Sequence, residues 1–149
     1  TASSAALLNG GNRITPTFLA RDPATPAKSG DRVVSSRTSA LLREVMRRNV
    51  TDPAGTGRRA DVPGFEVGGK TGTAELATAG GYRKKSVIAS FLGAFPASDP
   101  RYVTLVLIFE PKGQTITEGE ITAGRNAAPT TARLVERIAP LLGVPAKAL

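Results

Sequence analysis

The chain has 149 residues, enough for one domain with a true hydrophobic core, and its 40% hydrophobic and 21% charged residues are typical of a globular protein. It contains no cysteine and no histidine, which excludes a thiolate nucleophile, a histidine base, a Ser-His-Asp triad and a zinc finger. We expect neither a metal ion nor a cofactor. The net charge of +8 favours anionic partners. Its basic pairs lack interleaved aromatic residues, so we do not expect nucleic acid to be one of them.

The N-terminal half predicts two helices on either side of an irregular segment. The alanine and leucine run at residues 2–8, closed by a glycine pair, predicts the end of a helix. Three prolines within residues 12–31 predict an extended segment with little regular structure. Ser35 or Ser36 can cap an amphipathic helix over residues 38–50. The face that we expect to join the core carries Leu41, Leu42, Val45, Met46 and Val50.

The C-terminal half predicts three strands and one helix. The strands are expected at Phe65 to Leu76, Val87 to Phe95 and Tyr102 to Phe109. Six residues join the last two strands, too few for a parallel crossover, so these strands should be antiparallel neighbours. Both are apolar on both faces and need cover on both. A helix with Pro129 in its first turn and Gly143 beyond its end supplies one cover. The helix over residues 38–50, or material outside the chain, must supply the other. The predicted fold class is α/β (α+β), an antiparallel sheet flanked by helices.

The run from Gly68 to Glu75 carries one lysine and two threonines among three glycines, a composition that suits an anionic ligand. Two motifs overlap in it. Counted from Gly64, it satisfies the nucleotide-binding pattern G-x-x-x-x-G-K-S/T, while Lys70-Thr71-Gly72 satisfies the K-T-G element of penicillin-recognising serine enzymes. A phosphate-binding loop needs a buried strand before its first glycine and a helix after it. Residues 58–63, before Gly64, lack the pattern of a buried strand, and the two apolar strands that follow form a hairpin, so the sequence disfavours this interpretation.

The alternative places Lys70 to Thr73 within a strand. Extended backbone at Gly72 lets a substrate lie close to the chain, and the Lys70 ammonium and the hydroxyls of Thr71 and Thr73 can converge on a carboxylate. A hairpin edge with an ordinary surface lysine explains the same four residues without any function. From these residues alone, a non-catalytic cationic binding module, a nucleotide-binding loop and a carboxylate-binding strand all stay open.

Further motifs follow one another along nearly the whole chain. They occupy residues 5–11, 32–35, 55–57, 69–75, 90–97, 110–111 and 127–129. With these segments in this order, the sequence resembles the C-terminal part of the transpeptidase domain of class B penicillin-binding proteins, especially the division-septum (FtsI-like) peptidoglycan D,D-transpeptidases. The resemblance implies a C-terminal fragment of the fold shared by penicillin-binding proteins and serine β-lactamases.

The resemblance also implies roles for four residues. Lys70 would support proton transfer at a nucleophilic serine and attract the terminal carboxylate of the substrate. Thr71 and Thr73 would hydrogen-bond that carboxylate beside Gly72, and the backbone N–H of Thr73 would supply one oxyanion-hole donor. The implied ligands are peptidoglycan stem peptides and β-lactams. The implied partners are membrane proteins of the division machinery, at the periplasmic face of the bacterial inner membrane.

The chain departs from this family in its serines. None of them is followed by lysine three positions later, and no S-x-N motif is present. We therefore expect residues 1–149 to be the C-terminal portion of a transpeptidase domain, inactive alone, with the nucleophile on sequence that precedes Thr1. That preceding part of the same protein would be its first partner. A β-lactamase-like hydrolase or sensor on the same fold stays open, because only a deacylation rate separates it from a transpeptidase.

Overall fold

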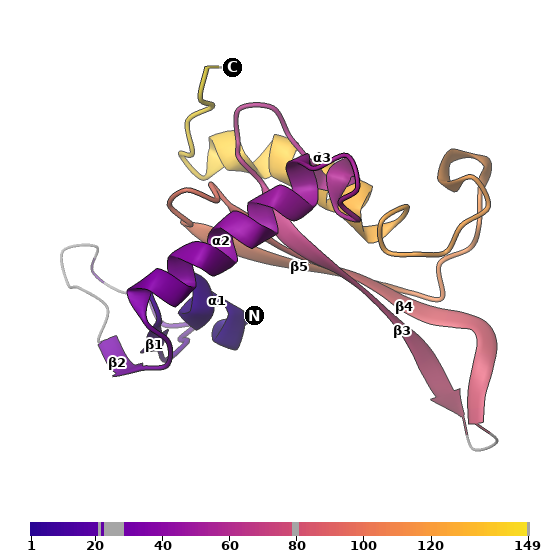
Figure 1. Ribbon diagram of the computed structural model, residues 1–149, viewed down its shortest axis with the longest axis horizontal. Coiled ribbons are helices and arrows are strands. Elements are labelled where there is room, and N and C mark those ends of the chain that lie inside the picture. The colour runs from indigo at the N-terminus through magenta and orange to yellow at the C-terminus, as the bar shows by residue number, and fades with distance from the viewer. Residues whose placement is uncertain (21, 23–28, 79–80, 149) are drawn as a thin grey trace.

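The structure is a computed structural model that describes residues 1–20, 22, 29–78 and 81–148. Its centre is a three-stranded antiparallel sheet in the order β3-β4-β5, formed by Gly68–Thr78, Gly81–Phe95 and Tyr102–Phe109. Helix α2, Ser36–Thr51, contacts β3, and helix α3, Ala127–Leu141, contacts β4 and β5 (Figure 1). The predicted fold class and the antiparallel pairing are confirmed.

The two helices lie on opposite faces of the sheet. A Cβ atom added at Gly68 would lie 3.2 Å from the backbone nitrogen of Arg47 on α2, whereas one at Gly93 would lie 3.4 Å from the Thr131 side chain on α3. Gly68 pairs directly with Ala94, the residue after Gly93. Because successive residues of a strand point to opposite faces, these two contacts define an α2 face and an α3 face.

The chain before the sheet contains more regular structure than its prolines predict. Helix α1, Ala2–Leu8, ends ahead of a glycine with φ of +92°, as expected. Strands β1, Asn12–Ile14, and β2, Ser29–Arg32, then pair antiparallel, which corrects the prediction of an irregular segment. The three prolines lie between these strands and interrupt neither of them. Ser35 caps α2, because its Oγ accepts a hydrogen bond from the Thr38 N–H at 3.0 Å.

The hairpin of β3 and β4 differs from the predicted strands at three ends. β3 begins at Gly68 instead of Phe65, because the Phe65 N–H donates to the carbonyl of Val62 in a turn and Glu66 takes a left-handed φ of +48°. β3 then runs two residues further than predicted, and β4 begins six residues earlier. Residues 79 and 80, which join these two strands, lie outside the described residues. Figure 1 shows the hairpin extending away from the helices.

The α3 face of the sheet carries the core. Phe91 and Phe95 of β4 have no exposed surface and belong to one buried cluster with Val135 of α3. Short 3-10 turns at Arg58–Ala60 and Thr115–Thr117 complete the connections on either side of the sheet strands. As predicted, Pro129 lies in the first turn of α3, and the helix ends one residue after Pro140.

The α2 face is only partly covered. The side chains of Leu105, Leu107 and Phe109 on β5 are 44%, 48% and 65% exposed, because α2 packs on β3 and not on β5. Leu41 and Val45 of α2 are 53% and 62% exposed, so the prediction that they join the core is wrong. The helix buries Ser39 and Val50 instead. We refer to Leu41, Val45, Leu105, Leu107 and Phe109 as the uncovered apolar residues.

Candidate active site

The strand β3 holds all four residues that the sequence singled out. Lys70 pairs with Leu92 and Gly72 with Ser90, so Lys70 and Gly72 share the α2 face. Thr71 and Thr73 lie on the α3 face. The Lys70 ammonium nevertheless folds back along the strand, where its Nζ donates to the Thr71 carbonyl at 2.6 Å and lies 3.4 Å from the Thr71 hydroxyl. The structure therefore brings Lys70 and Thr71 together.

A chain of hydrogen bonds fixes the Thr71 hydroxyl. Its Oγ lies 2.7 Å from the Thr56 Oγ, which itself donates to the Asn49 side-chain oxygen at 3.1 Å. Because a hydroxyl has one proton, Thr71 must be the donor to Thr56. The Asn49 Nδ2 donates in turn to the Gly69 carbonyl at 2.8 Å, which ties α2 to the start of the motif.

Sequence reasoning did not assign Asn49 and Thr56 to the site. The signal that could have found them was the Gly55-Thr56-Gly57 run, whose glycines let the loop close on Asn49. A Cβ atom at Gly55 would lie 2.1 Å from the Asn49 carbonyl oxygen, and one at Gly57 would lie 2.8 Å from its Nδ2. Both glycines are thus needed to bring Thr56 to Thr71.

Thr73 presents a hydroxyl proton that is available to a ligand. Its Oγ accepts a hydrogen bond from the Ala123 N–H at 3.1 Å. Among the described residues its proton has no acceptor, so it can be donated to an incoming carboxylate. Thr71 and Thr73 form one wall of a hollow of about 350 Å³, whose other walls are the loops at residues 55–59 and 120–125. We call this space the threonine hollow.

Charge around the threonine hollow is mostly positive. Arg58, Arg59 and Arg125 line it, together with the carboxylate of Glu120. Glu118, which has a left-handed φ of +56°, accepts hydrogen bonds from Arg59 and Arg125. Hydroxyl donors backed by cations suit the binding of a carboxylate.

Gly69 and Gly72 each leave little space for a side chain, but for different reasons. A Cβ atom at Gly69 would lie 2.3 Å from the ring of Phe91, a residue with no exposed surface. One at Gly72 would meet only the Ser90 Oγ, at 2.6 Å, and this Oγ donates to the Gly72 carbonyl at 3.0 Å. Gly69 is therefore required by the core, whereas Gly72 faces one small polar side chain.

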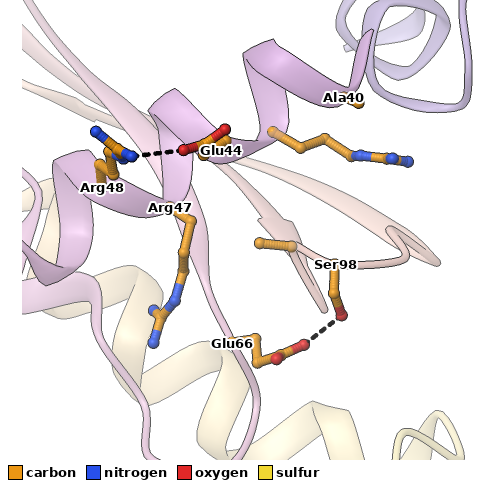
Figure 2. Close-up of a pocket in the computed structure, with 8 residues that line it drawn as sticks. Ala40, Glu44, Arg47, Arg48, Glu66 and Ser98 are labelled. Carbon is orange, nitrogen blue, oxygen red and sulfur yellow. Dashed lines mark hydrogen bonds and ion pairs between the residues drawn. The ribbon is translucent and has the colours of Figure 1, made fainter. Parts of the chain in front are cut away.

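A second hollow, of about 290 Å³, lies between α2 and the β4–β5 turn and shares no lining residue with the first (Figure 2). Glu66 lies in it, and its carboxylate accepts hydrogen bonds from the Lys147 ammonium, at 2.8 Å, and from the Ser98 hydroxyl. These bonds, first that of Lys147, hold the pKa of Glu66 below its ordinary value of 4.5. The bond from Lys147 thus holds the C-terminal segment against the turn that precedes β3.

The phosphate-binding interpretation of the motif is wrong. Lys70 and Thr71 lie within β3 and pair with Leu92 and Phe91 of β4. A phosphate-binding loop would place these residues at the N-terminus of a helix, where backbone N–H groups meet the phosphates. β3 continues as a strand to residue 78 instead.

Comparison with known proteins identifies the family of the chain. Residues 2–136 match the family model of the penicillin binding protein transpeptidase domain. The chain is 43% identical over 149 residues to the probable peptidoglycan D,D-transpeptidase FtsI of Caulobacter vibrioides, covering 95% of this chain and 25% of that protein. It is 38% identical over 153 residues to stage V sporulation protein D of Bacillus subtilis, covering 96% of this chain and 22% of that protein. The chain thus spans about a quarter of the length of these relatives.

Solved structures show the same fold. The apo transpeptidase domain of Burkholderia pseudomallei penicillin-binding protein 3 superposes with a TM-score of 0.85 and 32% identity, covering 99% of this chain and 43% of that one. Penicillin-binding protein 3 of Mycobacterium tuberculosis, in complex with ampicillin, gives a TM-score of 0.77 and 26% identity over 99% of this chain and 35% of that one. The chain therefore belongs to the penicillin-binding protein transpeptidase domain family.

Proposed function

We propose that the chain forms part of a peptidoglycan D,D-transpeptidase that cross-links stem peptides through a serine acyl-enzyme. The observation that carries the proposal is that β3 holds both a cation, Lys70, bonded to the Thr71 carbonyl, and a Thr73 hydroxyl proton that has no acceptor among the described residues. β3 is an edge of the described sheet, so every second backbone N–H points away from β4. Such N–H groups can receive a peptide or an oxyanion.

In the proposed reaction, β3 binds the substrate and stabilises the oxyanion, while a serine on another segment attacks the substrate carbonyl. A serine oxygen forms an ester with the carbonyl carbon of the penultimate residue as the peptide bond to the terminal residue breaks, and the serine proton leaves on the released amine. Thr71 and Thr73, beside Gly72, hold the terminal carboxylate. Lys70 supports the proton transfer by its positive charge, and the Thr73 N–H donates to the oxyanion. An acceptor amine then takes the acyl group and restores the serine.

The proposal requires that residues 1–149 act as the C-terminal portion of a longer polypeptide, called here the full-length protein. The S-x-x-K and S-x-N motifs would lie on its preceding part. The uncovered apolar residues of α2 and β5 give that part a surface to pack against, since exposed leucine and phenylalanine on a sheet face favour burial. The fragment alone would bind no penicillin covalently.

Location and partners follow from the proposed reaction. Its substrate is cell-wall peptidoglycan, so we place the protein at the periplasmic face of the bacterial inner membrane with membrane proteins of the division machinery. Among the described residues, no helix is long and apolar enough to cross a bilayer. A β-lactamase-like hydrolase or sensor would share the site, and rapid deacylation of a bound penicillin would identify it.

Labelling with a fluorescent penicillin tests the proposal. We expect the full-length protein to label, Lys70→Ala to label about 100-fold more slowly, and the isolated 149 residues not to label. Lys112→Ala removes an exposed lysine outside the threonine hollow and should label normally. Unchanged labelling of Lys70→Ala would remove Lys70 from the mechanism.

A further inference from the structure

One cation in the threonine hollow has no partner among the described residues. The side chain of Arg58 lines the hollow together with Thr71 and Thr73. Within the described part of the chain, this exposed side chain makes no hydrogen bond and no ion pair. Its backbone is held in place, because the Arg58 carbonyl accepts a hydrogen bond from the Asp61 N–H at 3.2 Å.

The two neighbouring arginines are neutralised. Arg59 donates to the Glu118 carboxylate at 3.0 Å, and Arg125 pairs with Glu118 and, at 3.6 Å, with Glu120. Two carboxylates thus serve two arginines. Among the described residues that line the hollow, Arg58 is left as the arginine without a carboxylate partner.

The hollow is also larger than one carboxylate requires. A carboxylate fills about the space of two water molecules, roughly 60 Å³, against about 350 Å³ for the hollow. A ligand that binds Thr71 and Thr73 through one carboxylate therefore leaves room for a side chain beside it. That side chain would meet the Arg58 guanidinium.

We propose that Arg58 forms a second anion subsite, which selects ligands with an additional acidic group on the residue whose carboxylate binds Thr71 and Thr73. This inference rests on the proposed function, in which that residue is the one released during acyl transfer. The planar guanidinium matches a carboxylate through paired N–H groups. Because Arg58 is exposed, the selection is modest and weakens with salt.

Two thioester probes in the full-length protein test the subsite. Both carry the same N-acyl-D-alanyl group. One releases 2-mercaptopropionate, with a single carboxylate, and the other releases mercaptosuccinate, with two. In each, the serine oxygen bonds to the acyl carbon as the acyl–sulfur bond breaks, and the serine proton ends on the departing thiol. The measurement is kcat/KM for each probe, and the selectivity is the ratio of dicarboxylate to monocarboxylate values.

For Arg58→Gln we expect the ratio to fall about 2- to 5-fold, because the dicarboxylate value falls further than the monocarboxylate value. Arg58→Lys should retain part of the selectivity for the dicarboxylate probe. Added salt should reduce the difference in selectivity between Arg58→Gln and wild type. Arg137→Gln is the matched control, because it removes an exposed arginine of α3 that does not line the hollow.

An unchanged ratio in Arg58→Gln, with the monocarboxylate probe still turned over, overturns the subsite and leaves the proposed function standing. An equal fall in Arg137→Gln also overturns it, because overall charge would then explain the effect. If wild type turns over neither probe, the proposed function fails and the subsite fails with it.

Discussion

Gly72→Ala tests whether Gly72 is required for the stability of the fold or for binding of the ligand at β3. The new Cβ atom would lie 2.6 Å from the Ser90 Oγ, which now donates to the Gly72 carbonyl. The methyl group must displace this hydroxyl and break its bond. The lost hydrogen bond costs about 0.5–1.5 kcal/mol and the displaced side chain about 1 kcal/mol more, so the free energy of unfolding should fall by roughly 1.5–2.5 kcal/mol.

Ser90→Ala should relieve this cost. With the Oγ removed, the nearest atom of residue 90 to the new methyl group is its Cβ, at an ordinary 4.0 Å. The double variant Gly72→Ala/Ser90→Ala should therefore regain the steric part of the loss, about 1 kcal/mol, while the hydrogen bond to the Gly72 carbonyl stays absent. Its reaction with fluorescent penicillin should stay about 100-fold slower than that of Ser90→Ala, because we propose that the ligand lies against the backbone at Gly72.

Thermal unfolding and labelling time courses of the four full-length proteins form a double-mutant cycle. If the double variant labels as fast as Ser90→Ala, Gly72 serves only to make room for Ser90, and its assignment to the substrate site is wrong. If Ser90→Ala restores no stability, the steric reasoning itself fails.

Three further substitutions test the strand and its surroundings in the full-length protein. Gly69→Ala should lower the free energy of unfolding by about 1–3 kcal/mol, read from urea unfolding, because its methyl group overlaps the buried ring of Phe91. Thr73→Val should slow penicillin acylation about 10-fold and more than Thr71→Val does, because of these two hydroxyl protons only that of Thr73 lacks an acceptor among the described residues; equal effects would contradict the hydrogen-bond assignment. Glu66→Gln should be less stable than wild type at neutral pH. The pKa of Glu66 is lower in the folded protein than in the unfolded chain. Its carboxylate therefore contributes fully to the free energy of unfolding above the unfolded-state pKa, and this contribution is lost as the pH falls through the folded-state pKa. The two melting temperatures should converge below pH 4.5, and a gap that persists in acid would refute this.

The sequence predicted the elements well because each carries its own local signal. Ser35, Pro129 and Gly143 mark helix ends by capping chemistry that needs no tertiary context, and the six-residue link settles the antiparallel pairing of the last strands. The start of β3 carried no such signal. It depends on the left-handed backbone of Glu66, which the contacts with Ser98 and the distant Lys147 hold in place.

The candidate site was predictable only for the residues that one short motif contains. Lys70, Thr71 and Thr73 are adjacent in sequence, whereas Thr56 reaches Thr71 across fifteen positions through the fold. The exposure of Leu41 shows a related limit. Periodicity identifies the apolar face of a helix, but it does not say whether this chain or another segment covers that face.

Mass spectrometry of the ampicillin adduct tests the central claim most directly. After digestion of the labelled full-length protein, the adduct should lie on a serine of a peptide that precedes residue 1. It should form about 100-fold more slowly when Lys70 is alanine. An adduct on a serine within residues 1–149, or one that forms at the same rate without Lys70, would contradict the account of β3 as the binding strand of a site whose nucleophile lies elsewhere.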